Sequence, residues 1–418
     1  MGRSAMPDYH NLRRPLRRLI AALWGSGLLI LSHNAAARFD VPGYELVYNA
    51  PQETTLQNDD LRDSADVWQQ MFAGAKQQID IAQFYVANQS GARLDGVLAQ
   101  LRAAGERGVK IRFLLEQKGV TMSTAETLEQ LKTIPGLEMR VIDYRQLSGG
   151  ILHAKYLLVD GKQAFVGSQN FDWRALDHIQ ETGLLISDNR VVSQIQAIFD
   201  QDWQAQALLA AQQTVPERSD QSDGQTYDNY LVASPRAFNP PGVIDSQSEL
   251  PRLLAAAKQR IRVQVMEYAP LSYGPQRTRP YYALIDNALR SAAARGVQIE
   301  LMVADWNTKK PAIDYLKSLA LLPNIQIKVV TIPPASSGFI PFARVIHSKI
   351  MTIDGELAWI GTSNWSGGYL DNSRNLELIL NNPSMAARVD KLYQQLWSSN
   401  YAAPLRIDYD YPPLKPGG

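Results

Sequence analysis

Two segments of the chain, residues 153–170 and 347–364, repeat one pattern of polar residues. Their sequences, HAKYLLVDGKQAFVGSQN and HSKIMTIDGELAWIGTSN, both read H-x-K, four residues, D, six residues, G-[ST]-x-N. Histidines and lysines at this spacing suit phosphodiester chemistry, because one histidine can attack phosphorus while the other protonates the leaving oxygen. Lysine and asparagine side chains can hold the non-bridging oxygens. The repeat therefore predicts one phosphoryl-transfer site built from both copies.

The candidate site residues come from equivalent positions of the two copies. The candidate catalytic residues are His153, Lys155, Asp160, His347, Lys349 and Asp354. The candidate phosphate-binding residues are Ser168, Asn170, Thr362 and Asn364. For the two aspartates a turn-forming role is an equal alternative, because Asp-Gly is a common two-residue hairpin turn.

A catalytic histidine also needs an acceptor on its second ring nitrogen, which fixes the tautomer and stabilises the charged form. Glu181 and Glu377 stand at the head of apolar stretches downstream of the two motifs. We expect each of them to orient one histidine, although Glu377 falls two residues later relative to its motif than Glu181 does. Core packing is the first expectation for the aromatic residues that follow the motifs closely, which are Trp173, Trp365 and Tyr369.

Each motif has the pattern of a β-hairpin. Apolar stretches at 156–159 and 350–353 follow the H-x-K segments, and the side chains of residues i and i+2 point to the same side of a strand. After the Asp-Gly turn the chain returns through residues 164–166 and 358–360. The hairpin thereby brings the G-[ST]-x-N segment back to the histidine and lysine of its own copy.

Strand and helix patterns alternate ahead of both motifs, and the second half of the chain repeats the order of the first. Local identities support the repeat, with Ala-Lys-Gln at 75–77 and 257–259 and Arg-Gly-Val at 107–109 and 295–297. The predicted strands are 44–48, 79–86, 109–115, 137–142, 261–268, 297–303 and 325–330, and the predicted helices are 64–77, 94–107, 125–133, 250–259, 281–295 and 312–320. The sequence therefore predicts an α/β fold of two similar halves, each a mixed β-sheet flanked by helices.

Composition shifts give the predicted domain boundaries. Residues 38–204 form the first half and 249–400 the second, and each half holds one motif. The connecting segment, 205–248, is rich in Gln, Ser, Asp and Pro and has a strand pattern at 229–234. Residues 401–418 are expected to be an extended, proline-rich tail without a hydrophobic anchor.

The first 37 residues have the pattern of a secretory signal peptide. A basic segment with Arg13, Arg14, Arg17 and Arg18 precedes an apolar run at 19–31, and Ala35, Ala36 and Ala37 offer a small-residue cleavage site. The run is shorter than the roughly 20 residues that a spanning helix needs. We expect export across the inner membrane to the periplasm or the outside, with an uncleaved amino-terminal anchor as the alternative.

Composition limits the chemistry. The 418 residues are 45% hydrophobic and 20% charged, which is enough for a sizeable core, and no cysteine is present. Disulfides, thiolate metal sites and thiol nucleophiles are therefore excluded, and three histidines beyond residue 37 are too few for a His-rich metal site. The net charge is +1, or −3 without residues 1–37, so the global charge gives no sign of a nucleic-acid footprint.

The paired motifs resemble those of the phospholipase D superfamily, whose mark is a doubled HKD motif. The residues after the motifs, at 170–176 and 361–366, resemble the branch of the endolysosomal phospholipase D-like 5′-exonucleases and the poxvirus envelope phospholipase-like proteins. The resemblance implies two α/β halves related by a pseudo-twofold axis, one active site at their interface, and no metal or organic cofactor.

The resemblance also implies a two-step reaction through a covalent phosphohistidine. It favours His153 as the nucleophile and His347 as the general acid, and the pseudo-symmetry leaves that assignment open. The expected activity is that of a secreted phosphodiesterase that hydrolyses phospholipids or transfers their phosphatidyl group, with possible peripheral membrane contact. A 5′-exonuclease acting on single-stranded nucleic acid is the alternative substrate class, and a non-catalytic envelope or binding protein that keeps the fold is an alternative of another class.

Overall fold

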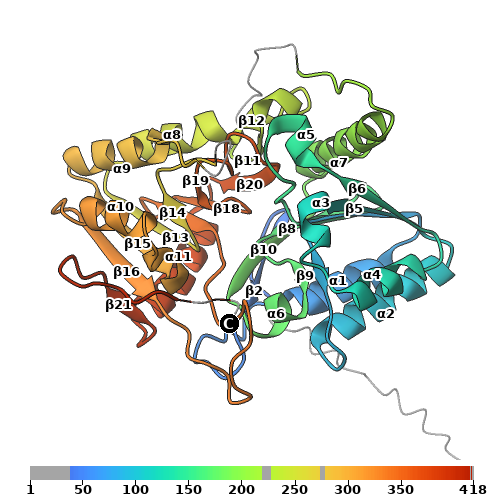
Figure 1. The fold of residues 1–418 in the computed structure, drawn as a ribbon, viewed down its shortest axis with the longest axis horizontal. Coiled ribbons are helices and arrows are strands. Elements are labelled where there is room, and N and C mark those ends of the chain that lie inside the picture. Colours follow the sequence, from blue (N-terminus) through green and yellow to red (C-terminus); the bar gives the residue numbers. More distant parts are fainter. Residues whose placement is uncertain (1–37, 219–226, 274–277, 415, 417–418) are drawn as a thin grey trace, which may run out of the picture. The chain divides into compact units, whose positions relative to one another are not determined.

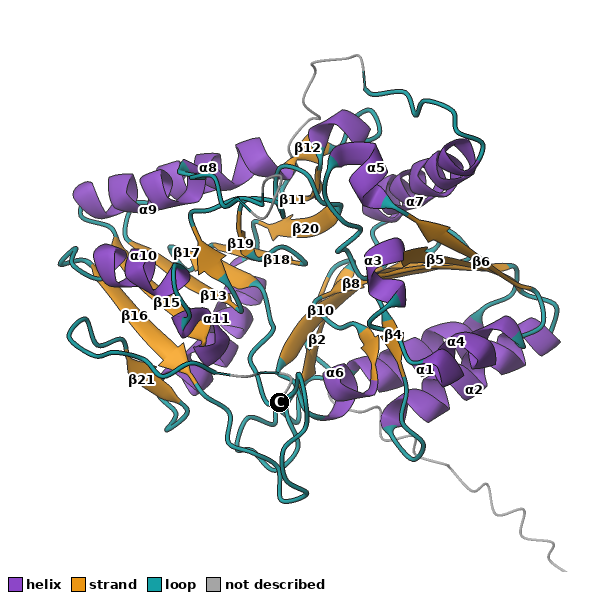
Figure 2. Cartoon of the chain, viewed as in Figure 1, coloured by secondary structure: helices purple, strands orange, loops and turns teal. Residues whose placement is uncertain are grey.

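The computed structural model describes residues 38–218, 227–273, 278–414 and 416. The predicted signal peptide at 1–37 lies outside the described residues. The described chain contains two large β-sheets (Figures 1 and 2), one of eight strands in the order β1-β2-β10-β8-β7-β3-β5-β6 and one of nine in the order β12-β11-β20-β18-β17-β13-β15-β16-β21.

The elements of the first half run as follows. They are β1 (Asp40–Val41), β2 (Tyr44–Asn49), α1 (Ser64–Gly74), β3 (Gln78–Gln83), β4 (Val86–Ala87), α2 (Arg93–Glu106), β5 (Lys110–Glu116), α3 (Gln117–Val120), α4 (Ala125–Lys132), β6 (Leu137–Ile142), α5 (Tyr144–Ser148), β7 (Tyr156–Val159), β8 (Gln163–Gly167), β9 (Phe171–Asp172), α6 (Trp173–Asp177), β10 (Glu181–Ile186) and α7 (Asn189–Ala210).

The second half repeats this series with few changes. Its elements are β11 (Asn229–Ser234), β12 (Ile244–Asp245), α8 (Ser246–Ala256), β13 (Arg260–Val265), β14 (Tyr268–Ala269), α9 (Leu284–Ala294), β15 (Gln298–Ala304), α10 (Ala312–Leu319), β16 (Ile325–Val330), β17 (Ile350–Ile353), β18 (Leu357–Gly361), β19 (Trp365–Ser366), β20 (Asn375–Leu380), α11 (Pro383–Trp397) and β21 (Ala402–Pro404), with short 3-10 helices at Arg236–Phe238 and Asp305–Thr308.

The two sheets have the same topology. Strands β3, β5 and β6 are parallel, and the hairpin β7-β8 with β10 and β2 extends the sheet by antiparallel pairing. Strands β13, β15, β16, β17, β18, β20 and β11 repeat the arrangement in the same order. The predicted α/β class, with two similar halves that each hold a mixed sheet flanked by helices, is therefore confirmed.

The repeated Arg-Gly-Val segments have a structural explanation. Nη2 of Arg107 donates to the carbonyl oxygens of Phe72 and Ala73 at the end of α1, at 2.8 and 3.3 Å. Nη2 of Arg295 donates to the corresponding carbonyls at the end of α8. Because the last carbonyls of a helix have no partner within the helix, a guanidinium placed there stabilises the helix end.

Two long helices contact strands of both sheets, and neither of them was predicted from the sequence. Helix α7 contacts β6 and β8 of its own half and also β11, and α11 contacts β17 and β18 and also β1. Their buried residues belong to one hydrophobic cluster that holds residues of both halves, such as Ile195, Phe199, Leu378 and Val389. The halves therefore share a core, and α7 runs six residues past the predicted boundary at 204.

The segments predicted to connect and to trail the two halves take part in the second sheet. Strands β11 and β12 lie within residues 205–248 and pair with each other, and β11 also pairs with β20. The expectation of a tail without a hydrophobic anchor was wrong, since β21 pairs with β16 and Leu405 packs against the core of the second half. An edge strand such as β16 offers unpaired backbone groups, which an extended tail can satisfy.

Candidate active site

The two motif segments meet through reciprocal backbone pairing between the halves. The amides of His153 and Ala154 donate to the carbonyl of Arg374, just before β20, at 3.0 and 2.8 Å. The amides of His347 and Ser348 donate to the carbonyl of Gln180, just before β10, at 2.8 and 3.1 Å. Each histidine therefore lies beside the strand entry of the other half, and both side chains are buried.

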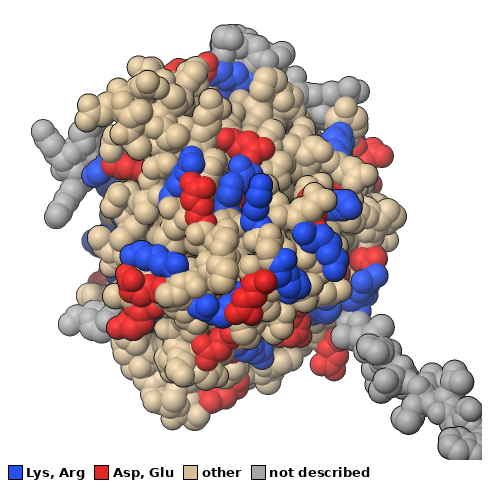
Figure 3. Space-filling view, turned by 90° about the vertical axis from the view of Figure 1, so that its right-hand side faces the viewer, with Lys and Arg blue, Asp and Glu red and all other residues tan. Residues whose placement is uncertain are grey.

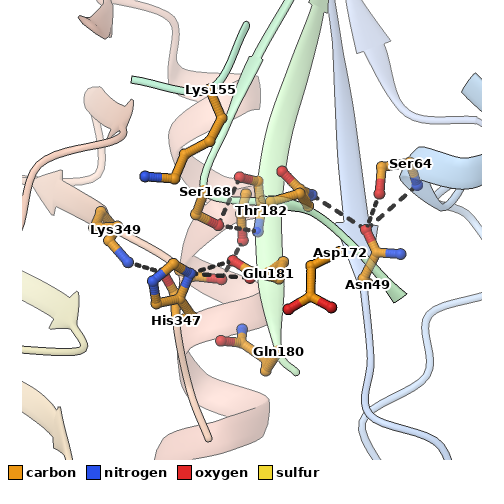
Figure 4. A network of polar contacts seen from close by, with 12 residues as sticks. Asn49, Ser64, Lys155, Ser168, Asp172, Gln180, Glu181, Thr182, His347 and Lys349 are labelled. Carbon is orange, nitrogen blue, oxygen red and sulfur yellow. Dashed lines mark hydrogen bonds and ion pairs between the residues drawn. The ribbon is translucent and has the colours of Figure 1, made fainter. Parts of the chain in front are cut away.

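His347 is oriented by a carboxylate. Its Nδ1 lies 2.9 Å from both carboxylate oxygens of Glu181, which is fully buried (Figure 4). A carboxylate only accepts hydrogen bonds, so Nδ1 carries a proton and Nε2 is left to face the substrate. Glu181 thus has the orienting role expected for it, and the histidine it serves belongs to the other half.

His153 is oriented by an amide. Its Nδ1 lies 3.0 Å from Oδ1 of Asn375. Nδ2 of Asn375 donates to the carbonyl of Tyr369 at 2.8 Å, which fixes the orientation of the amide. Oδ1 also accepts from Oγ1 of Thr362 at 2.8 Å, so Nδ1 of His153 is the donor and Nε2 keeps its lone pair.

The expectation that Glu377 orients a histidine was wrong. Its carboxylate accepts hydrogen bonds from Ser246 and Ser363, and no hydrogen bond joins it to a histidine in the part of the chain that the structure describes. Burial raises the pKa of Glu377 to about 7. Register explains the displacement, since Glu377 pairs with Gly361 whereas the matching partner of Gly167 is Gly183.

The correct counterpart of Glu181 was accessible by counting. Glu181 follows His153 by 28 residues, and the same interval from His347 ends at Asn375. Both residues begin the equivalent strands β10 and β20. Asn375 was not predicted because its side chain is an amide, whereas a carboxylate was expected to orient each histidine.

The two lysines are buried next to each other. Nζ of Lys155 donates to the carbonyl of His153, and Nζ of Lys349 to that of His347. Figure 4 shows both side chains on the same side of β10 as the His347 ring. Desolvation and the neighbouring Lys349 charge hold the pKa of Lys155 well below its usual range, and desolvation lowers the pKa of Lys349 to about 7. An anion between the two amines would restore both charges.

Asn170 and Asn364 also lie at equivalent buried positions. The hairpins place the G-[ST]-x-N segments beside the lysines, since the amide of Gly167 donates to the carbonyl of Lys155 and that of Gly361 to the carbonyl of Lys349. Oδ1 of Asn170 and both amide atoms of Asn364 have no hydrogen-bond partner among the described residues. Buried polar atoms without partners are rare in proteins. Nδ2 of Asn364 is a donor that suits a phosphoryl oxygen, whereas the two Oδ1 atoms are acceptors that suit a hydrogen-bond donor of a ligand.

Ser168 and Thr362 use their hydroxyls within the sheets. Oγ of Ser168 accepts from the amide of Thr182 and donates to its carbonyl, at 3.0 and 3.2 Å. Thr362 makes the equivalent contact with the amide of Leu376 and also holds Asn375. The structure therefore gives Thr362 an indirect role in orienting His153, and it gives Ser168 a role in joining β8 to β10.

The placement of Asp160 and Asp354 among the catalytic residues was wrong. Each has a positive φ in a hairpin turn, and the carboxylate of Asp160 accepts from the amides of Lys76, Gln77 and Gln78 at 2.8–2.9 Å. Asp354 accepts from residues 258–260 in the same way. These contacts pin each hairpin to the start of β3 or β13.

Two aromatic rings enclose His153. The ring centroids of His153 and Tyr369 are 4.8 Å apart, and those of His153 and Phe84 are 5.8 Å apart. Nζ of Lys155 lies 5.4 Å from the Phe84 ring centroid. Tyr369 is thus part of the site, although core packing was the expectation for it, whereas Trp365 is fully buried in the core as expected. Phe84 lies within the strand predicted at 79–86 and follows β3 directly, and it carried no signal of its own.

The sequence matches the family described as "Cardiolipin synthase, PLD-like domain" over residues 69–203 and 250–397, which include both motifs. The chain belongs to the phospholipase D superfamily. It is 31% identical to "Phospholipase D Z" of Dictyostelium discoideum, over 81% of this chain and 86% of that protein. It is 30% identical to "5'-3' exonuclease PLD4" of Mus musculus, over 82% of this chain and 75% of that protein.

Solved structures show the same fold at low sequence identity. The crystal structure of phosphatidylserine synthase from Haemophilus influenzae Rd KW20 aligns with a TM-score of 0.57 and 12% identity, over 82% of this chain and 85% of that one. The family match, the relatives of Dictyostelium discoideum and Mus musculus and the geometry of the site make the chain a phosphodiesterase of the phospholipase D superfamily.

The two histidines differ in their electrostatic surroundings. Burial, Lys155 and Lys349 hold the pKa of His153 well below its usual range. Burial also lowers the pKa of His347, but Glu181 opposes this shift by stabilising the imidazolium. The site therefore holds one histidine that is readily neutral and one whose charged form has a carboxylate partner.

Proposed function

We propose that this protein hydrolyses phosphodiesters of single-stranded nucleic acid through a covalent phosphohistidine, with His153 as the nucleophile and His347 as the general acid. The observation that carries the proposal is the unequal pair of Nδ1 partners. An amide on His153 leaves a neutral imidazole with a free lone pair on Nε2, and a carboxylate on His347 favours the protonated form that an acid requires.

In the first step Nε2 of His153 attacks phosphorus and the bond from phosphorus to the leaving oxygen breaks. Nε2 of His347 gives its proton to that oxygen, so the leaving group departs as an alcohol. In the second step His347 takes a proton from water, the water oxygen bonds to phosphorus and the P–N bond to His153 breaks. Lys155 and Lys349, with Asn170 and Asn364, bind the non-bridging oxygens throughout.

The cavity beside His153 supports a nucleotide substrate. Its volume is about 550 Å³, and Tyr369, whose ring contacts His153, is part of its lining. The lining also holds the ring of Tyr273, the cations Lys118 and Arg145, and the carboxylates Glu116 and Asp143, of which Asp143 pairs with Arg145 at 3.0 Å. Aromatic rings next to cations suit single-stranded nucleic acid, since bases stack on the rings and phosphates pair with the cations. The exonuclease relative of Mus musculus supports the same substrate class.

Surface charge supports a contact confined to the site. On the face of the first half that Figure 3 shows, Lys and Arg are intermixed with Asp and Glu. Such a face offers no continuous basic track for a long polyanion. A short segment of nucleic acid that enters the cavity would not need one.

Phospholipid is the second candidate substrate, for hydrolysis or phosphatidyl transfer. The loop between β16 and β17 leads to His347, and two of its phenylalanines, Phe339 and Phe342, are 61% and 56% exposed. Exposed aromatic side chains next to an active site suit peripheral contact with a lipid surface. The phospholipase D relative of Dictyostelium discoideum supports this reading. In the described residues we find no helix long and apolar enough to cross a membrane.

Residues 1–37 are the basis for proposing that the protein acts outside the inner membrane, in the periplasm or beyond.

The proposed substrate is tested on the purified protein with EDTA present. It is offered a fluorescent single-stranded oligonucleotide with a free 5′ end and, in parallel, phosphatidylcholine and phosphatidylglycerol vesicles with ethanol. We expect stepwise shortening of the oligonucleotide that disappears in His153→Ala and His347→Ala. Formation of phosphatidylethanol or free headgroup, without shortening of the oligonucleotide, would show that the substrate is phospholipid and not nucleic acid. Lack of turnover of every phosphodiester, including bis(p-nitrophenyl) phosphate, would favour a non-catalytic protein.

The histidine pKa values predict an acidic optimum for kcat/KM. The rate rises with pH as His153 loses its proton and falls as His347 loses its own. Because the pKa of each lies below its usual 6.5, the fall begins below neutral pH. Glu181→Gln removes the carboxylate that favours imidazolium, so the falling limb should move to lower pH. Asn375→Asp places a carboxylate on His153, so the rising limb should move to higher pH.

The control for these profiles is Asn189→Asp, which makes the same change on the exposed first turn of α7 and should leave both limbs in place. If Asn375→Asp moved the falling limb and Glu181→Gln the rising limb, the roles of the two histidines would be the reverse of those proposed.

A further inference from the structure

A second cavity adjoins the site through Glu267, whose charge acts on Lys349 of the second motif. Its volume is about 310 Å³, and it shares Tyr273 with the cavity beside His153. The residues that matter for its chemistry are Glu267, Tyr273, Arg279, Trp306, Lys309 and Lys310. The two cavities occupy equivalent places in the two halves, since Gln117 and Lys118 follow β5 and Trp306 and Asn307 follow β15.

Three cations line this second cavity. The guanidinium carbon of Arg279 lies 4.3 Å from the Tyr273 ring centroid, and its Nε donates to the carbonyl of Ser272 at 2.9 Å. Nη2 of Arg279 is buried without a hydrogen-bond partner, and the nearest carboxylate oxygen, on Glu267, is 4.0 Å away. Lys309 and Lys310 are exposed at the rim. The cavity therefore presents positive charge with a donor left for a ligand.

Glu267 is the acidic residue of the cavity, and its position ties the cavity to the site. It is mostly buried between β13 and β14, and burial raises its pKa while Arg279 opposes the rise. Its charge in turn acts to raise the pKa of Lys349. The cavity is thus adjacent to Lys349 of the second motif. It holds three cations and one carboxyl group, and burial favours the neutral form of that carboxyl group.

The reaction geometry determines which part of the substrate lies on the His347 side of the site. In-line displacement places the leaving oxygen opposite the attacking nitrogen, so with His153 as the nucleophile the leaving oxygen faces His347. The part of the substrate that departs with that oxygen must then extend past His347. The second cavity belongs to the half that carries His347, and Glu267 in its lining links it to Lys349 of the same motif.

We propose that this second cavity binds the next phosphate of a single-stranded polynucleotide, on the leaving-group side of the scissile bond. Arg279 contacts that phosphate, Lys309 and Lys310 attract it at the rim, and Tyr273 and Trp306 offer aromatic surface to the adjoining base. The inference rests on the proposed nucleic-acid function. It adds that the second cavity makes the enzyme prefer substrates with at least two phosphates.

Two isomeric dinucleotides test the proposal. The substrates pTpT and TpTp have the same composition and charge, but the second phosphate lies on opposite sides of the scissile phosphodiester. The products show which bond breaks and hence which isomer has its extra phosphate on the leaving side. We expect the isomer with the leaving-side phosphate to have the higher kcat/KM, by about ten- to a hundredfold, as for one charged hydrogen-bonded contact.

In Arg279→Gln and in the double variant Lys309→Gln/Lys310→Gln, the ratio of the two kcat/KM values should fall toward one. The same variants should leave bis(p-nitrophenyl) phosphate turnover within about twofold, since that substrate has a single phosphate. Lys162→Gln, in the exposed β7-β8 turn, removes one positive charge elsewhere and should keep the full preference.

The proposal is overturned if the wild type shows no preference, or if the cavity variants keep it. It is also overturned if they slow both isomers and bis(p-nitrophenyl) phosphate equally, because Arg279 would then act on the site as a whole. Turnover of bis(p-nitrophenyl) phosphate without cleavage of any oligonucleotide would instead reject the nucleic-acid function, and this inference with it.

Discussion

His347→Ala is expected to slow oligonucleotide hydrolysis by about 10²–10⁴-fold while still allowing the first half-reaction with bis(p-nitrophenyl) phosphate. The alkoxide leaving group of a nucleotide needs the proton of His347, whereas p-nitrophenolate leaves without one. His153→Ala should abolish both reactions, because it removes the atom that bonds to phosphorus. Rapid mixing with bis(p-nitrophenyl) phosphate measures this difference, since a burst of p-nitrophenolate is expected from His347→Ala and none from His153→Ala.

The same variant should also accumulate the covalent intermediate. Without His347 no base activates water in the second step, so the phosphorus stays on His153. Mass spectrometry after denaturation at alkaline pH, where phosphohistidine survives, should find the adduct on the peptide that contains His153. An adduct on His347 in the His153→Ala variant would exchange the roles of the two histidines, and an adduct on serine would reject the mechanism.

Arg374→Met is expected to lower the free energy of unfolding by about 3–5 kcal/mol, because it leaves a buried charge without a partner. Arg374 is fully buried and makes two hydrogen bonds of 2.9 Å to the carboxylate of Asp202 on α7. It also donates to the carbonyl of Ser234 and to Oδ1 of Asn239. The pair thereby joins α7 of the first half to the segment that precedes β20 of the second.

Urea-induced unfolding measures this loss against two further variants. Lys132→Met breaks an exposed pair with Glu129 and should cost about 0.5 kcal/mol or less. Combining Arg374→Met with Asp202→Asn neutralises the remaining charge and should recover a large part of the loss. Equal effects of the Arg374 and Lys132 variants would show that the buried pair contributes no more than a surface pair.

The sequence by itself determined the local geometry of the site. The spacing of H-x-K, Asp-Gly and G-[ST]-x-N predicted the two hairpins, because strand alternation and turn chemistry act over a few residues. The structure accordingly brings His153, Lys155 and Asn170 together within one copy, and His347, Lys349 and Asn364 within the other. The alternation of strands and helices predicted two similar α/β halves for the same reason.

Only the tertiary structure decided which residue serves which histidine. Glu181 orients His347 and Asn375 orients His153, because the entry of each sheet's central strand lies against the histidine segment of the other half. That pairing joins residues more than 160 positions apart, and no local pattern specifies it. The contacts of Glu377 with Ser246 and Ser363 are likewise tertiary, since Glu377 occupies the position of Gly183 in the strand register that the two sheets share, and register is specified by the packing of the sheet.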